Sequence, residues 1–107
     1  MTAMSLRVAS LALAGAAVVA ASAAHADGDK ALGQFLSSEC VTCHQITGRY
    51  EGIPPIVGWP KPVFIEIMGE YRAQKRANPI MQTIAVRLTE GEIAALAAYF
   101  GSLQPAN

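Results

Sequence analysis

The strongest constraint on this chain is a five-residue motif, Cys40-Val41-Thr42-Cys43-His44, which contains both of its cysteines and one of its two histidines. The two thiols lie one helical turn apart, so each can add to one vinyl group of the same haem, and the adjacent imidazole can coordinate the iron. The motif therefore predicts one covalently attached haem c, with Cys40 and Cys43 as thioether links and His44 as an iron ligand.

Three other uses of the motif fit the sequence less well. A disulfide between Cys40 and Cys43 would close a very small loop and stabilise the chain little. A thioredoxin-like redox pair needs a strand-helix-strand frame, which the surrounding sequence does not indicate. A structural zinc site needs four ligands, and the chain after its leader offers two cysteines and one histidine.

Residues 1–26 have the pattern of a secretory signal peptide. One early positive charge, Arg7, precedes an alanine-rich apolar run over residues 8–24, and Ala24-His25-Ala26 has the small-x-small pattern of a cleavage site. A retained membrane anchor is the alternative, because the run of about 17 residues is at the low end for a span. The sequence predicts cleavage before Asp27, export to the periplasm, one domain over residues 27–107 and no stable membrane span after cleavage.

The expected mature chain is small and nearly neutral. Its 81 residues suffice for one domain that hides a modest share of its surface, so a bound cofactor would help to stabilise it. Seven basic residues oppose eight acidic ones, which gives no general footprint for nucleic acid. Arg72, Lys75 and Arg76 form a local basic cluster that fits a solvated helix end or a docking patch.

Apolar residues at helical spacing predict three helices and no sheet, so the expected fold class is all-α. The first helix covers residues 29–38 with Asp29 as its cap, and the second begins at Pro62 and continues to about Arg76. Glycines and prolines over residues 45–62 indicate an irregular loop between them. The third helix begins with a capping box, Thr89-Glu90-Gly91-Glu92, and continues past Phe100.

The sixth iron ligand is expected to be a methionine, because no second histidine remains once the leader is removed. Met68 lies in the middle of the second helix, where methionine usually fills a core. Met81 follows Asn78-Pro79-Ile80 in a predicted extended loop and is the better candidate. Histidine and methionine together favour ferrous iron and close its coordination, which indicates an electron carrier rather than an enzyme.

Residues around the haem have weaker signals. The carbonyl of Pro54 or Pro55 could accept a hydrogen bond from the second ring nitrogen of His44 and fix its orientation. Trp59 and Arg87 could donate to haem propionates, although a tryptophan often only packs and an arginine is often only solvated.

Taken with its flanking segments, the motif resembles the class I cytochromes c, and among them the short bacterial periplasmic forms that include diheme cytochromes and the haem subunit of flavocytochrome c sulfide dehydrogenase. The likeness spans residues 27–107 and rests on four segments besides the haem motif, namely Gly33-Gln34-Phe35-Leu36, Pro54-Pro55-Ile56-Val57-Gly58, Asn78-Pro79-Ile80-Met81, and Leu88-Thr89 through Ala97-Ala98-Tyr99-Phe100.

The resemblance implies a small helical domain wrapped around one haem, with Met81 as the second iron ligand and Pro54 as the carbonyl that orients His44. It also implies that the first and last helices pack together. Leu32, Phe35, Leu96 and Phe100 are the residues expected at that contact. One departure is that Gln45 stands where many relatives have a glycine directly after the histidine.

Three functions are compatible with these features. The leading one is a periplasmic monoheme electron carrier whose partners are redox proteins, with a flavoprotein or a terminal oxidase as candidates. The alternative is a haem-bearing subunit of an oxidoreductase complex, such as a flavocytochrome c sulfide dehydrogenase, in which the partner is the catalyst. A haem-based ligand sensor would need Met81 to dissociate readily.

Overall fold

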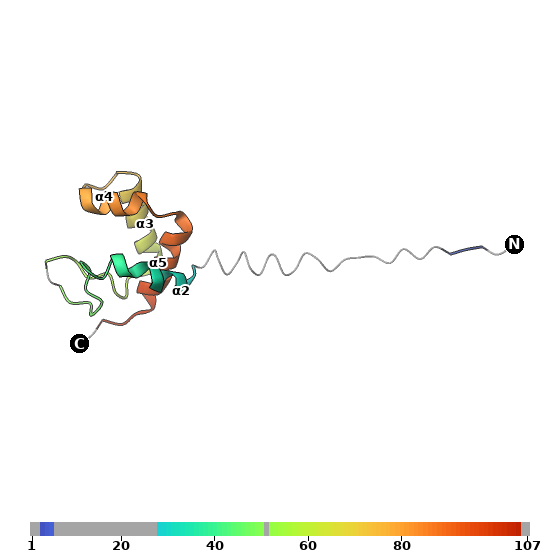
Figure 1. Ribbon diagram of the computed structural model, residues 1–107, viewed down its shortest axis with the longest axis horizontal. Helices are drawn as coiled ribbons and strands as arrows, with labels where there is room; N and C mark the ends of the chain where they lie inside the picture. Colours follow the sequence, from blue (N-terminus) through green and yellow to red (C-terminus); the bar gives the residue numbers. More distant parts are fainter. Residues whose placement is uncertain (1–2, 6–27, 51, 106–107) are drawn as a thin grey trace.

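The computed structural model describes residues 3–5, 28–50 and 52–105, and within them the fold is all-α, as the sequence predicts (Figure 1). The elements are α2 (Lys30–Leu36), a 3-10 turn η1 (Ser37–Glu39), α3 (Lys61–Arg72), α4 (Pro79–Val86) and α5 (Glu90–Ser102). The predicted cleavage site at Ala26 lies outside the described residues. None of the helices in the described ranges is long and apolar enough to cross a membrane.

Helix α2 leads directly into the cysteine motif. The side chain of Asp29 accepts a hydrogen bond from the amide of Leu32 at 3.1 Å, which confirms the predicted cap. The helix then tightens into η1, where the buried Ser37 donates its hydroxyl proton to the Gln34 carbonyl at 2.6 Å. The Cys40 amide donates to the Ser37 carbonyl at 2.8 Å, so the chain enters the motif without a break.

The predicted packing of the first helix on the last is confirmed, but two of the four expected contact residues are wrong. Leu96 and Phe100 are buried, whereas Leu32 is 38% exposed and Phe35 is 79% exposed. The close contact is made by the backbone of Gly33, where an added Cβ would lie 2.0 Å from the carbonyl oxygen of Ala95. Because α2 approaches α5 on its glycine face, Leu32 and Phe35 stay exposed, whereas Leu36 at the end of the helix packs against the core.

Helix α3 ends earlier than predicted, at Arg72 rather than near Arg76. Gln74 takes a left-handed conformation, with φ at 60°, and its amide donates to the Tyr71 carbonyl at 3.0 Å. The Lys75 amide donates to the Glu70 carbonyl at 2.8 Å. This pair of bonds is the Schellman arrangement that ends helices, with glutamine at a position where glycine is usual.

The largest error of the sequence-based prediction concerns residues 78–81. The sequence predicts an extended loop there, but the structure has the start of helix α4 (Pro79–Val86). Asn78 caps the helix by accepting from the Met81 amide at 3.1 Å, and Pro79 is its first residue. Proline has no amide proton to leave unpaired there, and its fixed φ suits a first turn. The Asn78-Pro79 pair therefore ends one segment and starts another helix.

The predicted capping box of α5 is confirmed. The hydroxyl of Thr89 accepts from the Glu92 amide at 3.1 Å, and the Glu92 carboxylate accepts from the Thr89 amide at 3.0 Å. From this start α5 runs beside α3 and α2 (Figure 1). Its Phe100 stacks on Phe64 of α3, with ring centroids 5.9 Å apart.

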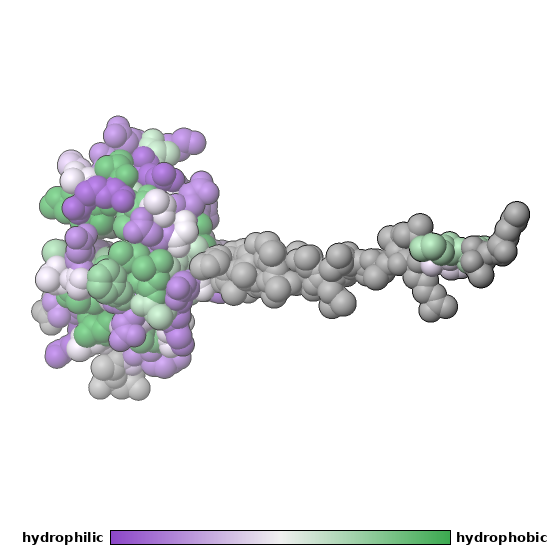
Figure 2. Space-filling model, turned by 45° about the vertical axis from the view of Figure 1, so that its right-hand side comes forward, coloured by the Kyte–Doolittle hydropathy of each residue, from purple (hydrophilic) through white to green (hydrophobic). Residues whose placement is uncertain are grey.

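The core lies between α3, α4, α5 and the loop before α3. Its buried members are Ile56, Val57, Phe64, Met68, Ala85, Ile93, Leu96, Ala97 and Phe100. Burial of these side chains is the main source of stability available to a chain of this size. On the face seen in Figure 2, apolar areas also break through the polar surface in several places.

Candidate functional site

The two cysteines occupy one tight helical turn. The amides of Cys43 and His44 both donate to the Cys40 carbonyl, at 3.1 and 2.8 Å. Thr42 donates its hydroxyl proton to the Glu39 carbonyl at 3.3 Å, which extends the turn backwards. Both thiols are free, with Cys40 half-buried and Cys43 exposed. The backbone therefore presents two unpaired thiols one turn apart, followed at once by an imidazole.

The environment of Cys40 keeps its thiol protonated. Burial, together with the negative charge of neighbouring Glu39, raises the pKa of Cys40 from 9.0 to about 11. A thiol in this state is a poor nucleophile near neutral pH, because the thiolate is the reactive form. A thioredoxin-like redox pair usually has a thiol with a lowered pKa, so this environment does not favour that use of the motif.

The imidazole of His44 is oriented by the loop that precedes α3. Its Nδ1 lies 2.6 Å from the carbonyl oxygen of Pro54. A carbonyl only accepts, so in the neutral imidazole Nδ1 carries the proton and Nε2 keeps a lone pair, as a metal ligand requires. Of the two prolines considered from the sequence, Pro54 makes the contact. The haem-binding roles of His44 and Pro54 remain predictions.

The position of Pro54 is set by the residues after it. Ile56 and Val57 are 7% and 5% exposed, and their burial anchors the loop in the core. The Gly58 amide donates to the Phe100 carbonyl at 2.8 Å, which ties the same loop to the end of α5. Gly58 has φ at 80°, a conformation that glycine adopts without strain.

Met81 lies close to His44, although 37 residues separate them in sequence. Its side chain is partly buried against the core, in the first turn of α4. Met68 is 6% exposed and packs within the core cluster, which agrees with its expected role as core filler. Of the two methionine candidates, Met81 is therefore the one that the fold brings to the histidine.

The weaker candidates have other contacts. Trp59 is half-buried and packs against the core. The exposed guanidinium of Arg87 lies 3.6 Å from the carboxylate of Glu39, an ion pair that the sequence reasoning missed because the partners are 48 residues apart. The propionate contacts proposed for Trp59 and Arg87 remain predictions.

These residues fit a haem better than a metal ion alone. The described part of the chain holds no group of three or more histidine, cysteine, aspartate or glutamate side chains able to bind a metal ion. A haem needs two free thiols, an imidazole nitrogen, a second axial ligand and apolar surroundings. Cys40, Cys43, His44 and Met81 could supply the first three of these, and the partly buried Val41, Trp59 and Leu88 are apolar.

A shallow groove of about 550 Å³ lies elsewhere, between α3 and the start of α5. It is lined by Ile65, Gly69, Arg72, Ala73, Glu90 and Ile93. None of the predicted haem-site residues lines it, so it is separate from the candidate site.

Comparison with known proteins adds one relative in sequence. No family model matches the chain. It is 33% identical over 92 residues to cytochrome c-552 of Acidithiobacillus ferridurans, an alignment that covers 79% of this chain and 40% of that protein. This similarity supports a c-type cytochrome. The chain spans about two fifths of the length of that cytochrome, and its all-α architecture is consistent with a cytochrome c fold.

Proposed function

We propose that this chain is a periplasmic monoheme c-type cytochrome that carries single electrons between redox proteins. The observation that carries the proposal is the meeting of His44 and Met81. The imidazole has Nδ1 bonded to the Pro54 carbonyl and Nε2 free, and the methionine thioether lies close by. Imidazole and thioether are the axial pair expected of an electron-transfer haem.

Each residue of the site would have one role. Cys40 and Cys43 would form thioether bonds to the two vinyl groups, which keeps the cofactor on an exported protein. His44 would coordinate iron through Nε2, while the Pro54 carbonyl keeps the proton on Nδ1 and the ring in place. A haem bound here would supply a one-electron couple at its iron. Met81 would fill the sixth position and leave no open site for a substrate, hence the proposal of a carrier rather than an enzyme.

The signal peptide, its cleavage before Asp27 and the periplasmic location belong to this proposal. A covalently bound cofactor suits an exported protein, which cannot replace a lost haem from a cytosolic pool. Mass spectrometry of the periplasmic form tests these points together. We expect a chain that begins at Asp27 and carries the mass of one haem. A mass without a porphyrin adduct would refute the proposal.

The iron ligands are tested on the same purified protein. A pyridine haemochrome spectrum should identify a haem joined by two thioether bonds. The oxidised protein should show the methionine-to-iron charge-transfer band near the red edge of its spectrum. Met81→Ala should remove this band, whereas the control Met68→Ala should keep it and lower stability, by about 2–5 kcal/mol for a buried methionine. A band lost in Met68→Ala and kept in Met81→Ala would reverse the assignment.

A second candidate function, a haem-bearing subunit of an oxidoreductase complex, is favoured by the apolar surface of α2. Phe35 is 79% exposed and Leu32, one helical turn before it, is 38% exposed. A partner protein could cover these two side chains. Light scattering of the native preparation measures the mass of the assembly and separates the two candidates. A complex subunit should show a mass above that of one chain, and Phe35→Ser should lower that mass. A strictly monomeric protein that co-purifies with no flavoprotein would favour the free carrier.

A further inference from the structure

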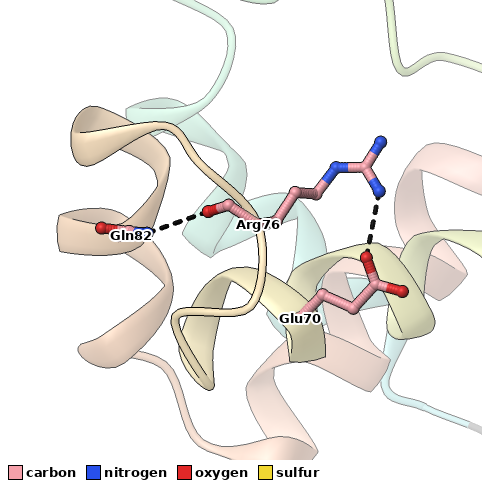
Figure 3. A network of polar contacts seen from close by, with 3 residues as sticks. All are labelled: Glu70, Arg76 and Gln82. Atoms are coloured by element: carbon pink, nitrogen blue, oxygen red, sulfur yellow. Dashed lines mark hydrogen bonds and ion pairs between the residues drawn. The ribbon is translucent and has the colours of Figure 1, made fainter.

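The first turn of α4, which carries Met81, is tied by a side chain to the segment that joins it to α3. Gln82 follows Met81 directly, and its Nε2 donates to the carbonyl oxygen of Arg76 at 2.9 Å (Figure 3). Gln82 is half-buried, and its hydrogen bond crosses from α4 to residues 73–78. The bond therefore limits how α4 can shift relative to that segment.

Arg76 is itself anchored on α3. Its guanidinium donates to the Glu70 carboxylate at 3.0 Å (Figure 3). The same guanidinium lies 5.7 Å from the centre of the Tyr71 ring. These contacts, chiefly the hydrogen bond to Glu70, raise the pKa of Arg76 above its already high value. The ion pair is exposed and contributes little to stability by itself. It does, however, connect the carbonyl that Gln82 uses to α3, which packs on the core.

A second side chain acts on Met81 from the other side in sequence. Asn78 Oδ1 accepts a hydrogen bond from the Met81 amide at 3.1 Å. Met81 thus lies between two residues whose side chains fix the first turn of α4, one by capping its backbone and one by bonding to the preceding segment. The sequence reasoning missed both, although Asn-Pro followed by apolar residues is a recognised helix start.

We propose that Asn78 and Gln82 are positioning residues for the Met81 thioether and hold it at the distance at which it can coordinate haem iron. This inference rests on the proposed function, since it assigns a task to residues around the same ligand. Two thioether bonds would fix the haem to residues 40–43, while its sixth ligand would come from an eight-residue helix. A helix this short is marginal without tertiary contacts, so small shifts of α4 would act directly on the iron-sulfur bond.

The test compares variants that differ in which bond they remove. Gln82→Leu removes the donor to the Arg76 carbonyl, and Asn78→Ala removes the cap on Met81. Thr83→Val is the matched control, because Thr83 donates to the Pro79 carbonyl at 2.8 Å within α4 and ties it to nothing else. Asn78→Asp should restore the behaviour lost in Asn78→Ala, since aspartate caps helices as well as asparagine does.

Two measurements on the holoprotein are needed. The first is the affinity of imidazole for the oxidised haem, followed by loss of the methionine-to-iron band. Gln82→Leu and Asn78→Ala should bind imidazole about five-fold more tightly than wild type, as expected for one lost hydrogen bond. The imidazole affinity of Thr83→Val and Asn78→Asp should stay within about two-fold of the wild-type affinity. The second is hydrogen exchange, in which Gln82→Leu and Asn78→Ala should raise exchange of the amides after Asn78, whereas Thr83→Val should not.

The outcomes separate the inference from the proposed function. A wild-type protein without the methionine-to-iron band would refute methionine ligation, and with it both proposals. A wild type with the band, but variants with unchanged imidazole affinity, would overturn the positioning role alone, even if exchange rises. Equal effects of Thr83→Val and Gln82→Leu would also overturn it, because general weakening of α4 would then explain the data.

Discussion

Two glycines within helices should respond oppositely to the same substitution. In Gly33→Ala of α2, the new Cβ would lie 2.0 Å from the Ala95 carbonyl oxygen and 2.8 Å from Cβ of Tyr99. Real contacts of this kind are not shorter than 3.0 Å, so α2 and α5 must separate by about 1 Å. In Gly69→Ala of α3, no atom lies within 4 Å of the new methyl group.

The expected magnitudes follow from two opposing effects. Alanine favours a helix over glycine by about 1 kcal/mol, and overpacking costs about 1–3 kcal/mol. Because the Gly33 clash is with the backbone of α5, its cost should be near the upper end, leaving Gly33→Ala destabilised by about 1–2 kcal/mol. Gly69→Ala has no such cost and should gain up to about 1 kcal/mol.

Thermal unfolding of the holoprotein, followed by circular dichroism, measures both variants. For a domain of this size each kcal/mol shifts Tm by about 4–8 °C. Gly33→Ala should therefore melt about 4–16 °C lower than wild type and Gly69→Ala up to about 8 °C higher. A Gly33→Ala protein at least as stable as wild type would refute the close contact between α2 and α5. A Gly69→Ala protein that melts below wild type would contradict the open space beside Gly69.

Three further predictions concern the helix ends and the cysteine turn. Gln74→Gly should raise the free energy of unfolding, measured in urea, by about 0.5–1 kcal/mol. The reason is that relief of about 1–2 kcal/mol of left-handed backbone strain exceeds the entropy cost of glycine. A lower free energy of unfolding would contradict this prediction. Thr89→Ala should cost about 1 kcal/mol and Thr89→Ser much less, measured in the same way, since serine keeps the α5 cap. The third prediction uses the haem-free chain, under conditions in which circular dichroism confirms that it is helical. There, alkylation of Cys40 at pH 8 should be about 100-fold slower than alkylation of a thiol with an unshifted pKa. Since its pKa is raised to about 11, the alkylation rate should keep rising about tenfold per pH unit up to that value, and a plateau near pH 9 would contradict the burial of the thiol.

The features predicted correctly from the sequence depend on residues near one another in the chain. Asp29 caps α2, and the box from Thr89 to Glu92 starts α5, because a side chain and the amide three residues later are in reach in any helical start. The irregular loop before α3 follows from its glycines and prolines in the same way. The all-α fold class was predictable for this reason.

The errors arise where a local pattern has two meanings. Asn78-Pro79 predicts the end of one helix followed by an extended loop, yet the same pair caps and begins α4. The resemblance to class I cytochromes c implies Leu32 and Phe35 at the contact with α5, and their helical spacing is compatible with a packed face. A seven-residue helix has too few positions for spacing to decide which face packs, and here the glycine face does.

The available chemistry follows from the order of residues alone, because that order provides two thiols one turn apart, an adjacent imidazole and a small choice of methionines. Which of these groups meet depends on how the helices pack. Burial of Ile56 and Val57 brings the Pro54 carbonyl to within 2.6 Å of His44, and packing of α4 brings Met81 close to the same ring. Such contacts between distant residues depend on how the whole core closes, which no short stretch of sequence specifies.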